Sequence, residues 1–87
     1  MQEFALLIDI PIARAMSVDA EVEQIYGETR NAICAYLLCL GVPTSQAQEV
    51  MQEVYLRLYQ TMGKGQVIQN VRAWLFRVAH NLGDLNH

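Results

Sequence analysis

The segment that decides the fold reads AQEVMQEVYLRLY and occupies residues 47–59. Its apolar residues recur every three or four positions, and at ~100° per residue this spacing gathers them along one side of a helix. Ser45 and Gln48 match a capping box at the start of this helix. The glycines at 63 and 65 are expected to end it near Met62. The predicted core stripe is Ala47, Val50, Met51, Val54, Leu58 and Met62, and the opposite side carries Glu49, Gln52, Glu53, Leu56, Arg57 and Gln60.

A second helix is predicted by RAWLFRVAHNL, residues 72–82, with Asn70 as its N-cap after a loop of about residues 63–69. Trp74 falls on the apolar side, so we expect it in the core rather than as an exposed stacking surface. The core side is predicted to be Val71, Trp74, Leu75, Val78, Ala79 and Leu82. The other side is basic, aromatic and amide-bearing: Arg72, Phe76, Arg77, His80 and Asn81.

Ahead of these lies a longer helix, expected to begin at Ser17 or Asp19 and to end at Gly41, with Pro43 preventing its resumption. Residues 1–20 are predicted to form an N-terminal extension or short helix, and residues 21–87 a single domain. No segment reads as a strand. The fold class is therefore all-α: a compact bundle of three main helices plus a short N-terminal helix. The apolar positions of the long helix include Val22, Ile25, Tyr26, Thr29, Ile33, Tyr36, Leu37 and Leu40.

Composition narrows the function classes. The 87 residues suffice for one small domain, and their net charge of −3 argues against attachment to nucleic acid by charge alone. No glycine-rich phosphate loop, metalloprotease motif or nucleophile with a signposted base is visible, so we expect no enzyme. Glu49 and Glu53 lie one turn apart, but surface solvation is the commoner use of such a pair.

The cysteines and histidines do not predict a metal site. Cys34 and Cys39 are five residues apart, which fits neither a redox C-x-x-C pair nor a zinc half-site. Together with His80 and His87 they match no zinc module. We expect buried, reduced thiols in a cytoplasmic protein, and no metal or cofactor.

The two predicted helices, in order and joined by a Gly-containing loop, strongly resemble region 2 of the extracytoplasmic-function (ECF) sigma factors. Their pattern runs A-E-D-hydrophobic-hydrophobic-Q-E-V-F-L-R-L-W, a loop, then A-W-L-Y-R-I-A-x-N. Residues 47–59 and 72–82 match it, and residues 25–38 fit the family's first helix. The resemblance covers about residues 22–85 and implies a helical, non-catalytic domain for bacterial transcription initiation.

The resemblance implies that the first motif docks on core RNA polymerase, against the coiled-coil clamp helices of its largest subunit. Glu49, Gln52 and Glu53 hold the matching positions, with Leu56 and Arg57 beside them. Carboxylates and an amide on one exposed side suit a partner's Arg and Asn side chains. Periodicity alone favours an ordinary solvated surface, and the motif reverses that preference.

The resemblance further implies melting of the minus-ten promoter element, with bases of the non-template strand flipped into pockets formed by the loop and the last helix. Such binding needs stacking surfaces, amides and cations. Asn81 matches the family's asparagine that faces the flipped base. The predicted DNA-binding residues are Lys64, Gln66, Arg72, Phe76, Arg77, His80 and Asn81, and the loop also offers the amide of Gln69.

Two departures from the family pattern leave alternatives open. Residues 83–87 are neutral to acidic where family members are usually basic, and no second domain (region 4) for the minus-thirty-five element follows. The sequence is either a fragment or a single-domain relative, with weak binding to DNA when isolated. The alternative function is an interaction-only module, or decoy, that binds polymerase or a regulator without productive promoter binding. The resemblance also leaves room for an anti-sigma partner; no membrane association is expected.

Overall fold

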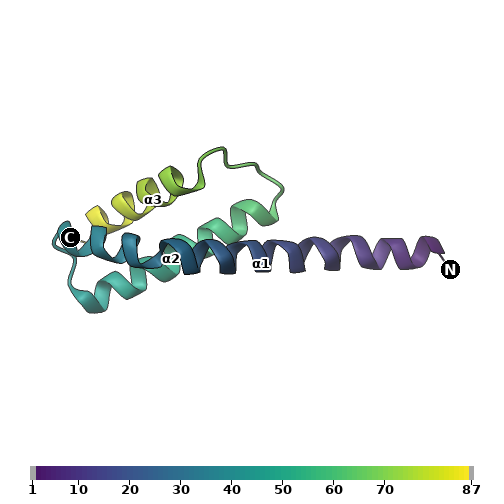
Figure 1. Ribbon diagram of the computed structural model, residues 1–87, viewed down its shortest axis with the longest axis horizontal. Helices are drawn as coiled ribbons and strands as arrows, with labels where there is room; N and C mark the ends of the chain where they lie inside the picture. Colours follow the sequence, from purple (N-terminus) through teal and green to yellow (C-terminus); the bar gives the residue numbers. More distant parts are fainter. Residues whose placement is uncertain (1, 87) are drawn as a thin grey trace.

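The computed structural model describes the backbone of residues 2–86 and the side chains of residues 17–84. Three helices follow one another: α1 (Gln2–Cys39), α2 (Thr44–Gly63) and α3 (Val71–Asn86). Each helix packs against the other two, and no strand occurs within residues 2–86 (Figure 1). The predicted all-α class is confirmed.

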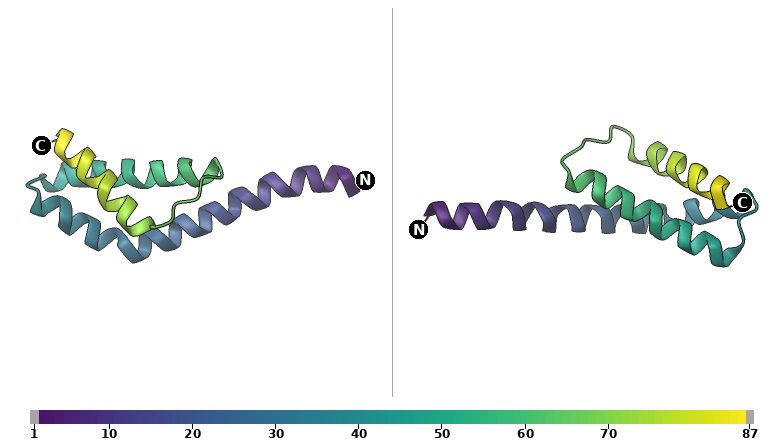
Figure 2. Two further views of the ribbon diagram at one scale, coloured as in Figure 1. Left: turned by 90° about the horizontal axis from the view of Figure 1, so that it is seen from above. Right: turned by 180° about the vertical axis from the view of Figure 1, so that it is seen from behind.

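Helix α1 is longer than the sequence suggested. Its N-terminal half projects beyond the body that its C-terminal half forms with α2 and α3 (Figures 1 and 2). The predicted start at Ser17 or Asp19, with a separate short helix before it, is wrong because α1 runs unbroken from Gln2. A proline such as Pro11 removes one N–H donor from a helix. That loss is local, and residues 2–26 contain no glycine and several strong helix formers.

The turn after α1 follows a Schellman arrangement. Gly41 has a φ of 91°, a left-handed conformation that favours glycine. The N–H of Gly41 donates to the Leu38 carbonyl at 3.0 Å, and the N–H of Val42 donates to the Leu37 carbonyl at 3.1 Å. Val42 and Leu37 are both buried, which adds the apolar contact typical of this motif. The predicted stop at Gly41 is confirmed.

The end of α2 repeats this arrangement. Gly65 has a φ of 83°, and its N–H donates to the Met62 carbonyl at 3.0 Å. The N–H of Gln66 donates to the Thr61 carbonyl at 3.3 Å. Helix α2 therefore ends at Gly63, one residue beyond the predicted Met62.

The two later helices begin differently. The predicted capping box at Ser45 is wrong: α2 begins at Thr44 with Pro43 as N-cap and no side-chain cap. The Pro43 carbonyl already accepts the N–H of Ala47 at 2.8 Å, which places Ser45 inside the helix. The predicted cap of α3 is confirmed, because Asn70 Oδ1 accepts the N–H of Ala73 at 3.0 Å.

The core lies where the three helices meet. Most of the predicted core is confirmed, although Met51, Met62, Val71, Trp74 and Val78 are half-buried at its edge. Gly83 is buried at the contact between α3 and α1, where an added Cβ would lie 2.9 Å from Leu37 Cδ2. The core cluster is Ile33, Leu37, Val42, Ala47, Val50, Val54, Tyr55, Leu58, Leu75, Ala79 and Leu82.

Within α2, Tyr55 is the core residue that periodicity did not predict. Its side chain is 7% exposed, and its hydroxyl lies 2.6 Å from Thr29 Oγ1. The Thr29 hydroxyl in turn donates to the Ile25 carbonyl at 2.6 Å. Burial raises the pKa of the Tyr55 phenol above its usual value.

Both cysteines are free, but they are less buried than expected. Cys34 is half-buried and Cys39 is exposed, so the prediction of buried thiols is wrong. The five-residue spacing turns Cys39 away from the core at the end of α1. Among the described residues no group of three His, Cys, Asp or Glu side chains could hold a metal ion; His87 lies outside them. None of the helices, as far as they are described, is long and apolar enough to cross a membrane.

Candidate functional site

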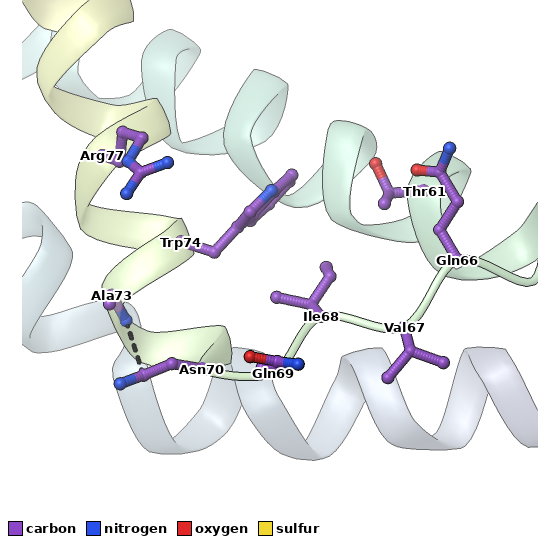
Figure 3. A pocket seen from close by; sticks show the side chains of 9 residues that line it. All are labelled: Thr61, Gln66, Val67, Ile68, Gln69, Asn70, Ala73, Trp74 and Arg77. Carbon is purple, nitrogen blue, oxygen red and sulfur yellow. Dashed lines mark hydrogen bonds between the residues drawn. The ribbon is translucent and has the colours of Figure 1, made fainter.

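A polar hollow lies between the end of α2, the connecting segment 64–70 and the first turns of α3. Figure 3 shows the indole of Trp74 at its centre, with Arg77 on one side and the Gln66 amide on the other. The volume of about 420 Å³ falls within the ~300–1,000 Å³ typical of ligand pockets. The hollow, named the loop hollow below, is lined by Thr61, Gln66, Val67, Ile68, Gln69, Asn70, Ala73, Trp74 and Arg77.

Two local features fix the shape of the loop hollow. The Schellman turn at Gly65 directs the chain away from α2, and the Asn70 cap sets where α3 begins. Ile68 packs against the core cluster, so the connecting segment is anchored on the body of the three helices. The open side then presents one aromatic ring, one guanidinium and several amides.

The predicted DNA-binding residues do not all meet at this hollow. Gln66 and Arg77 line it, whereas Lys64 caps the end of α2 and is exposed. Asn81 is exposed one turn beyond Arg77, on the same side of α3, because residues four apart are neighbours on a helix. Among the described residues, Arg77 is thus the cationic side chain that lines the loop hollow.

The remaining predicted residues of α3 lie on its other edge, against α1. The Arg72 guanidinium lies over the Phe76 ring at 5.4 Å, and Phe76 meets Tyr36 of α1 edge-on at 5.3 Å. The Tyr36 hydroxyl is 2.8 Å from His80 Nδ1. The sequence predicted one basic and aromatic face on this helix, but the structure divides these residues between two edges. Arg77 and Asn81 lie on the loop-hollow edge, and Arg72, Phe76 and His80 lie on the edge toward α1.

The predicted polymerase-binding residues stay together on the outside of α2. Arg57 Nε donates to Glu53 Oε2 at 3.1 Å, a pair that is about half exposed. Glu49 lies one turn before Glu53, and both line a shallow depression beside α3. Leu56 is 49% exposed. With Gln52 it borders a second depression, which faces α1. We call this set, Glu49, Gln52, Glu53, Leu56 and Arg57, the α2 face.

The chemistry available at both places is recognition rather than catalysis. An indole, a guanidinium and amides can stack on a flat ring, pair with a phosphate and bond to base edges. The first amides of α3 add a site that favours negative charge. The α2 face offers carboxylates and an amide around an exposed leucine, the composition of a small protein interface.

Sequence reasoning missed three aromatic residues near these places. Trp74 was assigned wholly to the core, although its spacing of three from Arg77 puts it at the margin of the apolar stripe. Tyr36 and Tyr55 lie at similar margins of their helices. An aromatic residue at the margin of a stripe, flanked by polar residues, is the signal that could have found them.

Comparison with known proteins identifies a family. The family model described as Sigma-70 region 2 matches residues 25–82, about two thirds of the chain. The matched range takes in α2, most of α3, the C-terminal part of α1 and every predicted site residue. Neither the search of curated proteins nor the search of solved structures found a match.

Proposed function

Since the chain belongs to the sigma-70 region 2 family, we propose that it acts as a sigma factor in bacterial transcription initiation, docking on core RNA polymerase through the α2 face and holding the unpaired minus-ten strand at the loop hollow. Region 2 is a regulatory domain of transcription and not a catalytic one. The observation that carries the proposal is the loop hollow, where Trp74, Arg77 and Gln66 surround one open space within the matched range.

The α2 face supports the docking step. Its residues lie outside the core, so partner contacts there need no rearrangement of the helices. The exposed Leu56 can be desolvated at the centre of the contact, while Gln52 and Glu53 supply hydrogen bonds around it. This arrangement, an apolar centre with polar neighbours, is typical of protein interfaces.

The loop hollow supports the DNA step. A base that leaves the duplex loses its stacking, and an aromatic side chain can restore ~1–3 kcal/mol of it. Trp74 offers that surface, Arg77 a partner for the phosphate, and Gln66 and Gln69 amides for a base edge. Lys64 and Asn81 extend the same path before and after the hollow. Because cations are few, affinity for free DNA is weak and polymerase docking comes first.

Three finer points belong to the same proposal. The motif in residues 72–82 favours the ECF subgroup, and the chain works in the cytoplasm, where transcription takes place. Residues 21–87 act as the region 2 domain.

The interaction-only alternative is favoured by the net charge of −3 and by the single arginine at the loop hollow. It predicts polymerase binding without retention of a DNA strand.

The docking step is tested with the isolated clamp helices of the polymerase's largest subunit. Gln52→Ala with Glu53→Ala should cost about 1–3 kcal/mol of binding free energy and leave the fold unchanged by circular dichroism. The matched control is Gln60→Ala, an exposed change on the same helix outside the α2 face. If the double variant binds as tightly as the parent, the α2 face is not the docking surface.

A further inference from the structure

The N-terminal half of α1 extends beyond the other two helices. The molecule measures 56 Å along its longest axis against 24 and 22 Å across it, and α2 and α3 do not run alongside most of residues 2–16 (Figures 1 and 2). We call residues 2–16 the projecting arm; at ~1.5 Å per residue it is about 22 Å long. A helix of this length is marginal in water unless one side packs against another surface. The arm therefore needs a partner surface.

The apolar stripe of α1 runs on into the projecting arm. Within the body, Val18 is buried, and Val22 and Ile25 pack against the core. Counted back from Val18 at ~100° per residue, positions 4, 8, 11 and 15 fall on the same side of the helix. These positions hold Phe4, Ile8, Pro11 and Ala15. The side by which α1 packs on α2 and α3 thus continues, still apolar, beyond those two helices.

An apolar hollow lies at the base of the projecting arm, between α1, the end of α2 and the start of α3. Its volume is about 260 Å³. Val67, on its rim, is 88% exposed, an unusual position for a large apolar side chain. Val18 belongs both to this hollow and to the stripe, so the two apolar surfaces are continuous. The apolar residues that line this base hollow are Val18, Met62, Val67, Ile68 and Val71.

We propose that the projecting arm packs on a second copy of this chain, with the two arms antiparallel and the tip of each arm on the base hollow of the other. A closed pair requires a surface that is complementary to itself under a two-fold rotation. The spacing along α1 meets this condition. A two-fold axis at Pro11 brings position 4 of one copy opposite position 18 of the other, because both lie seven residues from it. Position 4 is the apolar tip of the arm, and Val18 lines the base hollow.

Charge favours a second copy over a membrane surface as the occupant. The only charged residues within 4–16 are Asp9 and Arg14, which have opposite signs, so two paired arms bring together no net charge. Helices that lie on membranes are rich in Lys and Arg on their polar side. The arm has one such residue, and Glu21 lines the base hollow, so an anionic lipid surface is poorly matched.

The first test is sedimentation equilibrium of the full chain. The parent should show a monomer–dimer equilibrium with a Kd of about 1–100 μM, as suits a small interface. Phe4→Glu changes the tip, and Val67→Lys changes the exposed rim of the base hollow. Each change occurs twice in a dimer, so at about tenfold per contact each should weaken association about a hundredfold. Circular dichroism should show the parent's helix content in both variants, because neither position belongs to the core cluster.

The matched control is Leu38→Glu, which puts the same charge at an exposed apolar position on another side of α1. Its Kd should stay within about twofold of the parent value. A mixture of the Phe4→Glu and Val67→Lys variants gives the sharper test. In the mixed pair the new carboxylate of one copy meets the new ammonium group of the other, and the second contact is unchanged. The mixture should therefore associate within about tenfold of the parent.

Three results would overturn the proposal. The first is a parent that stays monomeric over this concentration range; if it then floats with anionic lipid vesicles, the arm belongs to a membrane surface instead. The second is a Kd that neither Phe4→Glu nor Val67→Lys changes, or that Leu38→Glu raises as much. The third is a mixture that associates no better than either variant alone, which would mean that the tip of one copy does not meet the base hollow of the other.

Discussion

The buried hydrogen bond between Thr29 of α1 and Tyr55 of α2 contributes to stability. How much each substitution lowers the free energy of unfolding depends on which hydroxyl donates its proton. The Thr29 hydroxyl has one proton, which it donates to the Ile25 carbonyl at 2.6 Å. Tyr55 must therefore be the donor in its own 2.6 Å bond with Thr29 Oγ1. Removal of the Thr29 acceptor leaves the buried Tyr55 hydroxyl without a hydrogen-bond partner. Removal of the Tyr55 hydroxyl leaves Thr29 still bonded to the Ile25 carbonyl.

Thr29→Val removes the acceptor and keeps the branched shape. The Tyr55 hydroxyl then lacks a partner in a side chain that is 7% exposed, which should cost about 1–3 kcal/mol of unfolding free energy. Tyr55→Phe should cost less, about 0.5–1.5 kcal/mol. The double variant should be no less stable than Thr29→Val alone, because both polar groups are gone.

The assay is urea denaturation of the parent, both single variants and the double variant, followed by circular dichroism. The four free energies close a double-mutant cycle, and a coupling of about 0.5–3 kcal/mol is expected for residues in contact. The assignment of Tyr55 as the donor is contradicted if the two single effects simply add, or if Tyr55→Phe lowers the unfolding free energy more than Thr29→Val does. Either result would mean that the Tyr55 hydroxyl is not a stranded donor without Thr29.

Three further predictions concern stability. Gly27→Ala should raise it by about 0.5–1 kcal/mol, because an added Cβ meets nothing within 4 Å and alanine favours the helix. Gly83→Ala should lower it instead, since overpacking at a 2.9 Å approach to a buried leucine costs about 1–3 kcal/mol; thermal melting of the pair should shift in opposite directions. The stability of the protein at alkaline pH should depend on Tyr55, because burial raises the pKa of its phenol in the folded state. The contribution of Tyr55 to the free energy of unfolding is complete below the unfolded pKa of about 10 and is lost as pH rises through the folded pKa. Melting temperature between about pH 9 and 12 should fall less steeply in Tyr55→Phe, and an equal slope would contradict this assignment.

The parts of the fold that depend on short-range spacing could be predicted from the sequence. Leu58 and Leu75 lie at the centres of apolar stripes, and both are fully buried. Gly41 and Asn70 act through bonds to residues within one turn, so their roles as stop and cap were also visible. The capping box failed because Pro43, two residues earlier, had already begun the helix.

The parts that depend on contacts between distant residues could not be predicted. Tyr55 is buried because Thr29, 26 residues earlier, accepts its hydroxyl, and no pattern within α2 shows this. Phe76 and His80 do not line the loop hollow, because both contact Tyr36 of α1 instead. The candidate DNA-binding residues were therefore the right chemical types for such a site, but their division between two edges of α3 needed the three-dimensional structure.

The most direct measurement of the central claim is selection of DNA strands by the polymerase complex. Core polymerase carrying the chain, fused to a promoter-anchoring domain if required, is mixed with single strands randomised over the minus-ten region, and retained strands are sequenced. We expect enrichment of one short motif. Asn81→Ala should change that motif, whereas Arg77→Ala should lower retention of all strands. Retention no better than with core polymerase alone, or without any preferred motif, would contradict base recognition at the loop hollow and leave the interaction-only module as the function.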